Sequence, residues 1–314
     1  MKRDPQLAPV RFAPFNATMP AWLDLVTEFR WQFNSVAGLY HRVSAAGNAL
    51  TACVNREKLD IIETTSSGAL ALAYLRSRPR IPVVTRVSTT AAQLVAHNAG
   101  SARWPDRVEQ RWEEHQVRAS DRLVTHTLHH RDELCRAWNL PTTSFTIIPH
   151  GIRLPPREAL PAPVRRETIE VLYVGRFEHR KGIDVLLEIL PGLLAAEPRA
   201  RFTLAGQDSS DYWQRLFWAT NPTIDRQRVT FAGVVPPERL QACYRDCAVF
   251  VAPSRYESFG LIYVEAMAWG KPVVGCRAGG VPEVIADGIT GLLAEPGDKA
   301  TLSAALLQLI QAPA

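Results

Sequence analysis

The sequence predicts a two-domain α/β protein with parallel sheets. From residue 58 onward, short apolar runs rich in β-branched residues alternate with longer segments of helical spacing, an order typical of parallel strands joined by helices. A length of 314 residues with 46% hydrophobic content suits two domains with separate cores. A proline-rich stretch of little periodicity, residues 149–168, predicts the boundary, with an N-terminal domain over 1–150 and a C-terminal domain over 151–314.

The N-terminal half is expected to open with a helix and then to alternate between strands and helices. Prolines interrupt the first twenty residues, and residues 21–43 follow with apolar side chains at helical spacing. The expected strands are 58–63, 81–87, 121–127 and 144–151, and the expected helices are 66–77, 104–120 and 130–138. A histidine group at 126, 129 and 130 lacks the spacing of a metal site and is interpreted as a solvated turn.

The C-terminal half predicts a second alternating domain. Its expected strands are 169–175, 201–206, 228–235, 247–253 and 271–276. A helix is expected over 258–269, with Ser258 at its N-cap and Gly270 just past its end. Because a helix N-terminus attracts phosphate, the amides of Phe259, Gly260 and Leu261 are candidate phosphate ligands.

Two glutamates, Glu257 and Glu265, flank this segment and are candidate ligands of hydroxyl groups. A helix rises about 1.5 Å per residue, which would place them roughly 12 Å apart. That is too far for the paired carboxylates of a glycosidase, which need about 5 to 9.5 Å, but it suits a ligand as long as a nucleotide sugar. The alternative makes Glu257 a solvated loop residue and Glu265 a charge on a helix face.

The turn after strand 169–175 carries the basic residues that a diphosphate would need. Arg176 and Lys181 lie in GRFEHRKG, where Gly175 allows close approach of the backbone. Gly206 and Gly233 end two further strands, where a nucleotide base could approach. The chain contains no D-x-D triplet, so we expect no metal in the reaction.

The segments PSRYESFGLIYVEAMAWGKPVVG and GGVPEVIADGITGLL resemble the nucleotide-sugar site of the retaining family-four glycosyltransferases of the GT-B fold. The spacing of the two glutamates carries the resemblance, together with three later pairs, Gly279–Gly280, Pro282–Glu283 and Asp287–Gly288. It implies two Rossmann-like domains facing each other across a cleft. The N-terminal domain is expected to be incomplete, because no strand and glycine-rich turn precede 58–63, and the final helix that crosses back is also expected to be missing.

The resemblance implies catalytic and donor-binding roles for these residues. Glu257 would hold hydroxyls of the donor sugar, and Glu265 would hold the ribose. Arg176 and Lys181 would stabilise the departing diphosphate. Many members also carry a histidine after the strand that corresponds to 81–87. Here Ser88 stands in that loop and could bind a sugar hydroxyl, but it cannot carry a proton at neutral pH as histidine does.

The predicted function is retaining, metal-independent transfer of a sugar from a nucleoside diphosphate sugar to a glycan, lipid or small-molecule acceptor, without a cofactor. The alternatives are a catalytically impaired nucleotide-sugar-binding protein of the same fold and an enzyme like glycogen phosphorylase or glycogen synthase. The base, sugar, acceptor and oligomeric state are left open.

Charge and cysteine content indicate the kind of partner and the compartment. A net charge of +5 suits anionic partners, including peripheral contact with an anionic membrane, whereas no motif indicates nucleic acid. Five cysteines without a framework, and an opening without a signal-like apolar stretch, predict the cytoplasm.

Overall fold

The computed structural model describes residues 28–98, 100–160 and 167–311, with side chains from residue 35 onward. The chain forms two compact units. Unit 1 comprises residues 1–86 and 103–122, and unit 2 comprises residues 87–102 and 123–314. In the described ranges, no helix is both long and apolar enough to cross a bilayer. The predicted boundary at residue 150 and the predicted incomplete N-terminal domain stay predictions.

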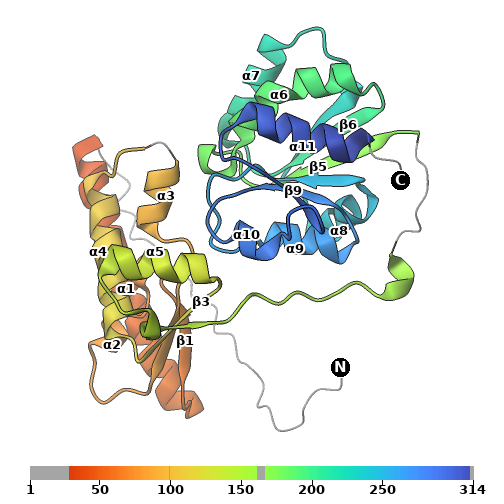
Figure 1. Ribbon diagram of the computed structural model, residues 1–314. Coiled ribbons are helices and arrows are strands. Elements are labelled where there is room, and N and C mark those ends of the chain that lie inside the picture. Colours follow the sequence, from red (N-terminus) through yellow and green to blue (C-terminus); the bar gives the residue numbers. More distant parts are fainter. Residues whose placement is uncertain (1–27, 99, 161–166, 312–314) are drawn as a thin grey trace. The chain divides into compact units, whose positions relative to one another are not determined.

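Unit 1 packs helices against a short parallel strand pair (Figure 1). Its elements are α1 (Glu28–Glu57), β1 (Ile62–Thr65), the 3-10 turn η2 (Ser67–Ala69), α2 (Leu72–Leu75), β2 (Val83–Arg86) and α4 (Trp104–Ala119). Strands β1 and β2 pair in parallel with Ile62 opposite Val83. Leu39 and Val43 of α1 are buried in one cluster with Leu72, against which Trp112 of α4 packs. The apolar spacing that predicted a helix near the N-terminus therefore supplies the core of this unit.

The larger part of unit 2 is a six-stranded parallel sheet in the order β10-β9-β8-β5-β6-β7. Its strands are β5 (Ile169–Val174), β6 (Ala200–Ala205), β7 (Val229–Gly233), β8 (Val249–Val251), β9 (Val273–Cys276) and β10 (Gly291–Ala294). Its helices are α6 (Ile183–Ala196), α7 (Tyr212–Thr220), α8 (Pro237–Asp246), α9 (Leu261–Ala268), α10 (Val281–Val284) and α11 (Lys299–Gln311). Short 3-10 turns lie at η5 (His179–Lys181), η6 (Ser209–Asp211) and η7 (Arg226–Arg228). The strands predicted in this half are confirmed.

Each face of this sheet has its own apolar core. Helices α6, α7 and α11 cover one face, and α8, α9 and α10 cover the other (Figure 1). Leu190 and Leu306 are fully buried on the first face, and Tyr244 and Tyr263 on the second. Since both faces are covered, the central strands are apolar throughout instead of alternating, as in β8, where all three residues are buried.

Unit 2 also contains two segments that precede residue 150. One is the loop from Val87 that leads into α3 (Ala91–His97), and the other runs through β3 (Arg122–Thr125) and α5 (Leu128–Trp138) to η3 (Thr142–Ser144) and β4 (Phe145–Ile147). Strands β3 and β4 pair in parallel, with Leu123 opposite Phe145. The 3-10 turn η4 (Arg157–Ala159) follows before the sheet domain begins.

Two predicted helices differ from the structure. The helix expected over 66–77 is two short pieces, because Gly68 and Ala69 have φ of +70° and +51° and interrupt the helical backbone. The helix expected from Ser258 begins only at Leu261, because Gly260, with φ +95°, takes the N-cap position in a left-handed conformation. The assignment of Ser258 as N-cap is therefore wrong, and the 12 Å estimate, which assumed a continuous helix, no longer holds.

The interpretation of the histidines as a solvated turn is wrong for two of the three, whereas His129 is exposed. His126 and His130 are buried, at 1% and 0% exposure. His130 lies on α5, where the Thr125 hydroxyl is 2.6 Å from its Nδ1 and Gln93 Oε1 is 3.2 Å from its Nε2. Burial, followed by the charges of His126 and His129, lowers the pKa of His130 to about 3.

This lowered pKa predicts a loss of stability in acid. Because the unfolded chain takes up a proton on His130 near pH 6.5 and the folded chain near pH 3, stability falls as pH drops between these values. Relative to His130→Gln, the wild type should lose about 2 to 3 kcal/mol of unfolding free energy between pH 6.5 and 4.5. Urea unfolding at several pH values measures this. The exposed His115→Gln serves as control, and parallel pH profiles for wild type and His130→Gln would contradict the expectation.

Candidate functional site

The three predicted strand-end glycines lie together at the carboxyl edge of the sheet. The Gly175 amide donates to Ala205 O at 3.0 Å, and the Gly206 amide donates to Gly233 O at 2.8 Å. A Cβ on Gly206, whose φ is +154°, would lie 1.8 Å from Gly175 O. These glycines are required for the strand ends to approach each other, and their contact with a base stays a prediction.

The turn after β5 gathers charges of both signs. The exposed Arg176 guanidinium lies 3.2 Å from Glu178, which also accepts a 2.8 Å hydrogen bond from the buried Arg180. Lys181 forms an ion pair with Glu257, on the loop after β8. The two predicted basic residues thus differ, because Arg176 points a 57% exposed side chain outward while Lys181 is engaged with a carboxylate.

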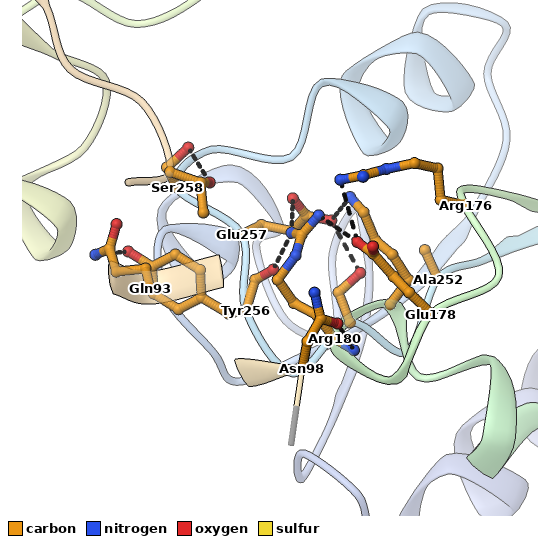
Figure 2. Close-up of polar contacts among 12 residues, drawn as sticks. Gln93, Asn98, Arg176, Glu178, Arg180, Ala252, Tyr256, Glu257 and Ser258 are labelled. Carbon is orange, nitrogen blue, oxygen red and sulfur yellow. Dashed lines mark hydrogen bonds and ion pairs between the residues drawn. The ribbon is translucent and has the colours of Figure 1, made fainter. Parts of the chain in front are cut away.

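Glu257 is buried, at 7% exposure, and is surrounded by donors (Figure 2). Its Oε1 accepts hydrogen bonds from Lys181 Nζ and, at 2.9 Å, from the Ser254 hydroxyl. Its Oε2 lies 3.6 Å from Arg180 NH1, beyond hydrogen-bonding distance. A buried carboxylate with one oxygen saturated and the other facing a cation can accept a hydroxyl hydrogen on that second oxygen. The alternative of a solvated loop residue for Glu257 is therefore wrong.

The turn that follows Glu257 presents free backbone donors. In the described part of the chain, no acceptor hydrogen-bonds to the amides of Phe259, Gly260 and Leu261. Gly260 has no room for a side chain, since a Cβ there would lie 2.6 Å from the Tyr263 ring. The three amides thus stand at the N-terminus of α9, where the helix dipole favours an anion.

Glu265 lies about one helical turn further along, in the middle of α9. Its Oε2 accepts a 2.9 Å hydrogen bond from the Tyr244 hydroxyl. Burial, followed by the charge of Glu265, raises the pKa of Tyr244 above its ordinary value, so that Tyr244 acts as a donor. The hydrogen bond fixes one carboxylate oxygen and orients the other.

The loop after β2 reaches the Glu257 segment. The Thr89 hydroxyl donates to Ser258 Oγ at 3.2 Å, and Thr127 donates to Ser258 O at 3.0 Å. Ser88 is half-buried next to Thr89. The structure thus brings the Ser88 loop to the same turn as the free amides, as the family resemblance of the sequence implied.

The later motif pairs contact the Glu257 turn, the start of α5 and strand β10. Gly279 has φ +55°, and a Cβ there would lie 2.1 Å from Glu257 O. The carboxylate of Glu283 accepts hydrogen bonds from the amides of Leu128 (2.9 Å) and His129 (2.7 Å), at the start of α5. Asp287 forms an ion pair with Arg277 and accepts a 2.9 Å bond from the Leu293 amide. The glycine pair therefore positions the turn directly, whereas Glu283 and Asp287 fix neighbouring segments of unit 2.

Sequence reasoning missed several residues that the site brings together. Arg180 and Glu178 lie inside the predicted basic turn but read there as surface charges. The ring of Tyr256 stacks on His97 of α3 at 4.5 Å, and its hydroxyl lies 2.5 Å from both Glu133 and Gln93. His126 stacks on His150 at 3.6 Å, and both rings contact the edge of Phe259. Nothing in the sequence distinguishes Arg180 from a solvated arginine of the same turn. In the described residues, no histidine, cysteine and carboxylate group has the geometry of a metal site.

The packing around Gly279 predicts a steric effect that a matched glycine lacks. Gly279 and Gly288 both have positive φ, +55° and +76°, but only Gly279 faces backbone within 4 Å. Gly288→Ala should cost about 1 to 2 kcal/mol of unfolding free energy through backbone strain alone. Gly279→Ala should cost about 1 to 3 kcal/mol more, because the methyl displaces the Glu257 segment. Urea unfolding of both variants compares them, and equal losses would contradict the expected packing.

Two family profiles match the chain. The profile described as Glycosyltransferase Family 4 matches residues 8–154, and the profile described as Glycosyl transferases group 1 matches residues 168–312. Together they cover nearly the whole sequence. The second match contains Arg176, Lys181, Glu257 and Glu265, which are the residues on which the resemblance rests.

Relatives of known activity agree with these profiles. Glycogen synthase from Mycobacterium tuberculosis is 32% identical over 205 residues, which is 63% of this chain and 47% of that protein. D-inositol 3-phosphate glycosyltransferase from Corynebacterium diphtheriae is 30% identical over 252 residues, 75% of this chain and 58% of that protein. The chain thus spans about half the length of the curated relatives it matches.

Solved structures show the same fold. Sucrose-phosphate synthase from Thermosynechococcus elongatus superimposes with a TM-score of 0.70 at 25% identity, over 86% of this chain and 69% of that one. Anabaena HepE, in complex with UDP and glucose, gives a TM-score of 0.65 at 19% identity, over 85% and 72% of the two chains. Given both profiles and these folds, the chain belongs to the group 1 glycosyltransferases and has the GT-B fold.

Proposed function

We propose that this protein transfers a sugar from a nucleoside diphosphate sugar to a glycan, lipid or small-molecule acceptor. One observation carries the proposal. Glu257 is buried among Lys181, Arg180 and Ser254, next to three adjacent free amides at the start of α9. A buried carboxylate beside unpaired donors suits a ligand that offers hydroxyls at one point and anionic oxygens at the next.

The charges of the site support a diphosphate as the leaving group. Arg176, Arg180 and Lys181 oppose Glu178 and Glu257, so the three cations exceed the two carboxylates by one. Negative charge accumulates on the diphosphate as the glycosidic bond breaks, and a fixed positive excess stabilises that change. Arg176, with its exposed side chain, is the residue best able to turn toward the phosphates.

The two glutamates would bind different parts of the ligand, the sugar and the ribose. Glu257 Oε2 would accept a hydroxyl of the sugar, and Glu265 would accept the ribose hydroxyls with Tyr244 holding its other oxygen. Ser88, beside the turn that Thr89 contacts, would add a sugar contact. Gly206 and Gly233 would leave room for the base.

We propose transfer with retention and without metal or cofactor. Acceptor attack on the same face as the departing diphosphate needs no carboxylate nucleophile, and the leaving group can take the acceptor proton. Relatives support the donor class, since the Anabaena HepE structure contains UDP and glucose. The net charge of +5 also supports peripheral contact with an anionic membrane at a cytoplasmic surface.

The replacement of a family histidine by Ser88 favours a second candidate, a nucleotide-sugar-binding protein that does not transfer. Such a protein would keep the donor contacts of Glu257, Glu265 and Arg176. Release of free nucleoside diphosphate from its sugar donor distinguishes the two, because only the enzyme produces it. A glycogen phosphorylase or synthase activity would instead require a glucan in the assay.

A thermal-shift panel of nucleoside diphosphates and their sugars tests the donor class. A ligand that binds only the folded state adds about 2.7 kcal/mol to the free energy of unfolding at a hundredfold excess over Kd. The melting temperature rises as a result. We expect one base and one sugar to stabilise the protein more than the others. A flat response across the panel would contradict the proposed function.

The two glutamates should have separable effects. Glu265→Gln should weaken binding of the free nucleoside diphosphate by about tenfold, because a charge-assisted hydrogen bond to the ribose is lost. Glu257→Gln should leave that affinity nearly unchanged and lower turnover by about ten- to a hundredfold. Calorimetry and nucleotide-release kinetics measure the two quantities. Equal and negligible effects of both changes would remove these residues from the site.

A further inference from the structure

The most buried cation of the site is Arg180, which adds to the positive charge of the site from beneath its surface. Arg180 is 3% exposed and lies between the turn after β5 and the loop after β8 (Figure 2). Its guanidinium donates to Glu178 Oε1 at 2.8 Å and to Tyr256 O at 3.0 Å, and it faces Glu257 Oε2 at 3.6 Å. It is too deeply buried to touch the donor, so beyond its charge it can act only through the residues it contacts.

The main chain of Arg180 is fixed on both sides. Its amide donates to Asn98 Oδ1 at 2.9 Å, and its carbonyl accepts from the Arg255 amide at 2.7 Å. Asn98 caps α3, the helix that follows the Ser88 loop. Arg180 therefore joins three segments of unit 2, namely the basic turn, the Glu257 loop and the end of α3.

The contacts of Arg180 are not those of a residue selected for stability alone. Its Nε is buried without a hydrogen-bonding partner. An unsatisfied buried donor and a buried charge both cost folding free energy, and an apolar side chain of similar volume would avoid both costs. Within unit 2, the buried charge instead lies against both Glu178 and Glu257.

We propose that Arg180 is a positioning residue that sets Glu257 for the donor sugar. Because Lys181 and Ser254 occupy Oε1, the direction of Oε2 depends on Arg180, and Oε2 is the oxygen available to a sugar hydroxyl. Through Glu178, Arg180 also holds the partner of Arg176. This inference deepens the proposed function and rests on it.

The expected signature is a loss of sugar recognition without loss of nucleotide recognition. Arg180→Met keeps the apolar length and removes the charge. It should bind the nucleoside diphosphate within about threefold of wild type. The factor by which the sugar raises affinity over that of the nucleoside diphosphate, the sugar increment, should fall about tenfold, and kcat should fall by a similar factor. Arg180→Lys keeps the charge and should restore part of the sugar affinity and part of kcat.

Calorimetry and turnover measure these quantities with the nucleotide and sugar nucleotide selected by the thermal-shift panel, UDP and UDP-glucose being the first pair. Arg228→Met is the matched control, because Arg228 donates to three carbonyls, those of Leu194, Glu197 and Ala200, away from the charge cluster. It should lower the melting temperature and leave the sugar increment unchanged.

The outcomes separate this inference from the proposed function. A wild type that binds no nucleotide would overturn the function and, with it, the inference. A wild type that binds while Arg180→Met keeps the full sugar increment and kcat would overturn the inference alone. Equal losses for nucleotide and sugar nucleotide, or a loss matched by Arg228→Met, would show a general effect on folding and would also overturn it.

Discussion

The site depends on the carboxylate of Glu257, which is buried among cations and hydrogen-bond donors. A buried carboxylate loses the hydration it has in water and persists as an anion only with close counter-charges and hydrogen bonds. Lys181, Arg180 and Ser254 supply them from two loops that are 76 residues apart in sequence at the Lys181 contact. The glycines of the strand ends, the left-handed turn at Gly260 and the packing of Gly279 all allow these loops to approach closely. A charge arrangement thus dictates much of the local backbone.

Much of the fold could be predicted from the sequence, because buried parallel strands are short apolar runs that differ clearly from the turns between them. The helix start was predicted less well. Ser258 matches the preference for N-caps, yet its carbonyl accepts a bond from Thr127 and Gly260 takes the N-cap position. Tertiary contacts therefore overrode a local rule. Helix α3 was missed because its seven residues carry no apolar periodicity and none is buried.

Site residues could be predicted where the residue type alone indicates a ligand role. They could not be predicted where the role depends on burial in the folded protein. Glu257, Glu265, Arg176 and Lys181 could be chosen because carboxylates and cations at loop ends are typical ligands of sugars and phosphates. Arg180 could not be chosen, since an arginine in a turn is usually solvated. His130 reads as polar in the sequence, yet it lies in a buried hydrogen-bond chain with Thr125 and Gln93. Such roles emerge only when distant segments meet.

The strand order β10-β9-β8-β5-β6-β7 has a further consequence. Chain order runs outward in opposite directions from the β5–β8 pair, and the helices that follow these strands, α6 and α9, lie on opposite faces of the sheet. The chain therefore leaves β5 and β8 toward opposite faces of the sheet, and ligands of open parallel sheets bind at such a switch point. All five charges of the Glu257 cluster come from these two loops. The loops after β6, β7 and β9 contribute no charge to the cluster and contact it through glycines, so donor and acceptor preference can evolve in their other residues without disturbing the charge arrangement.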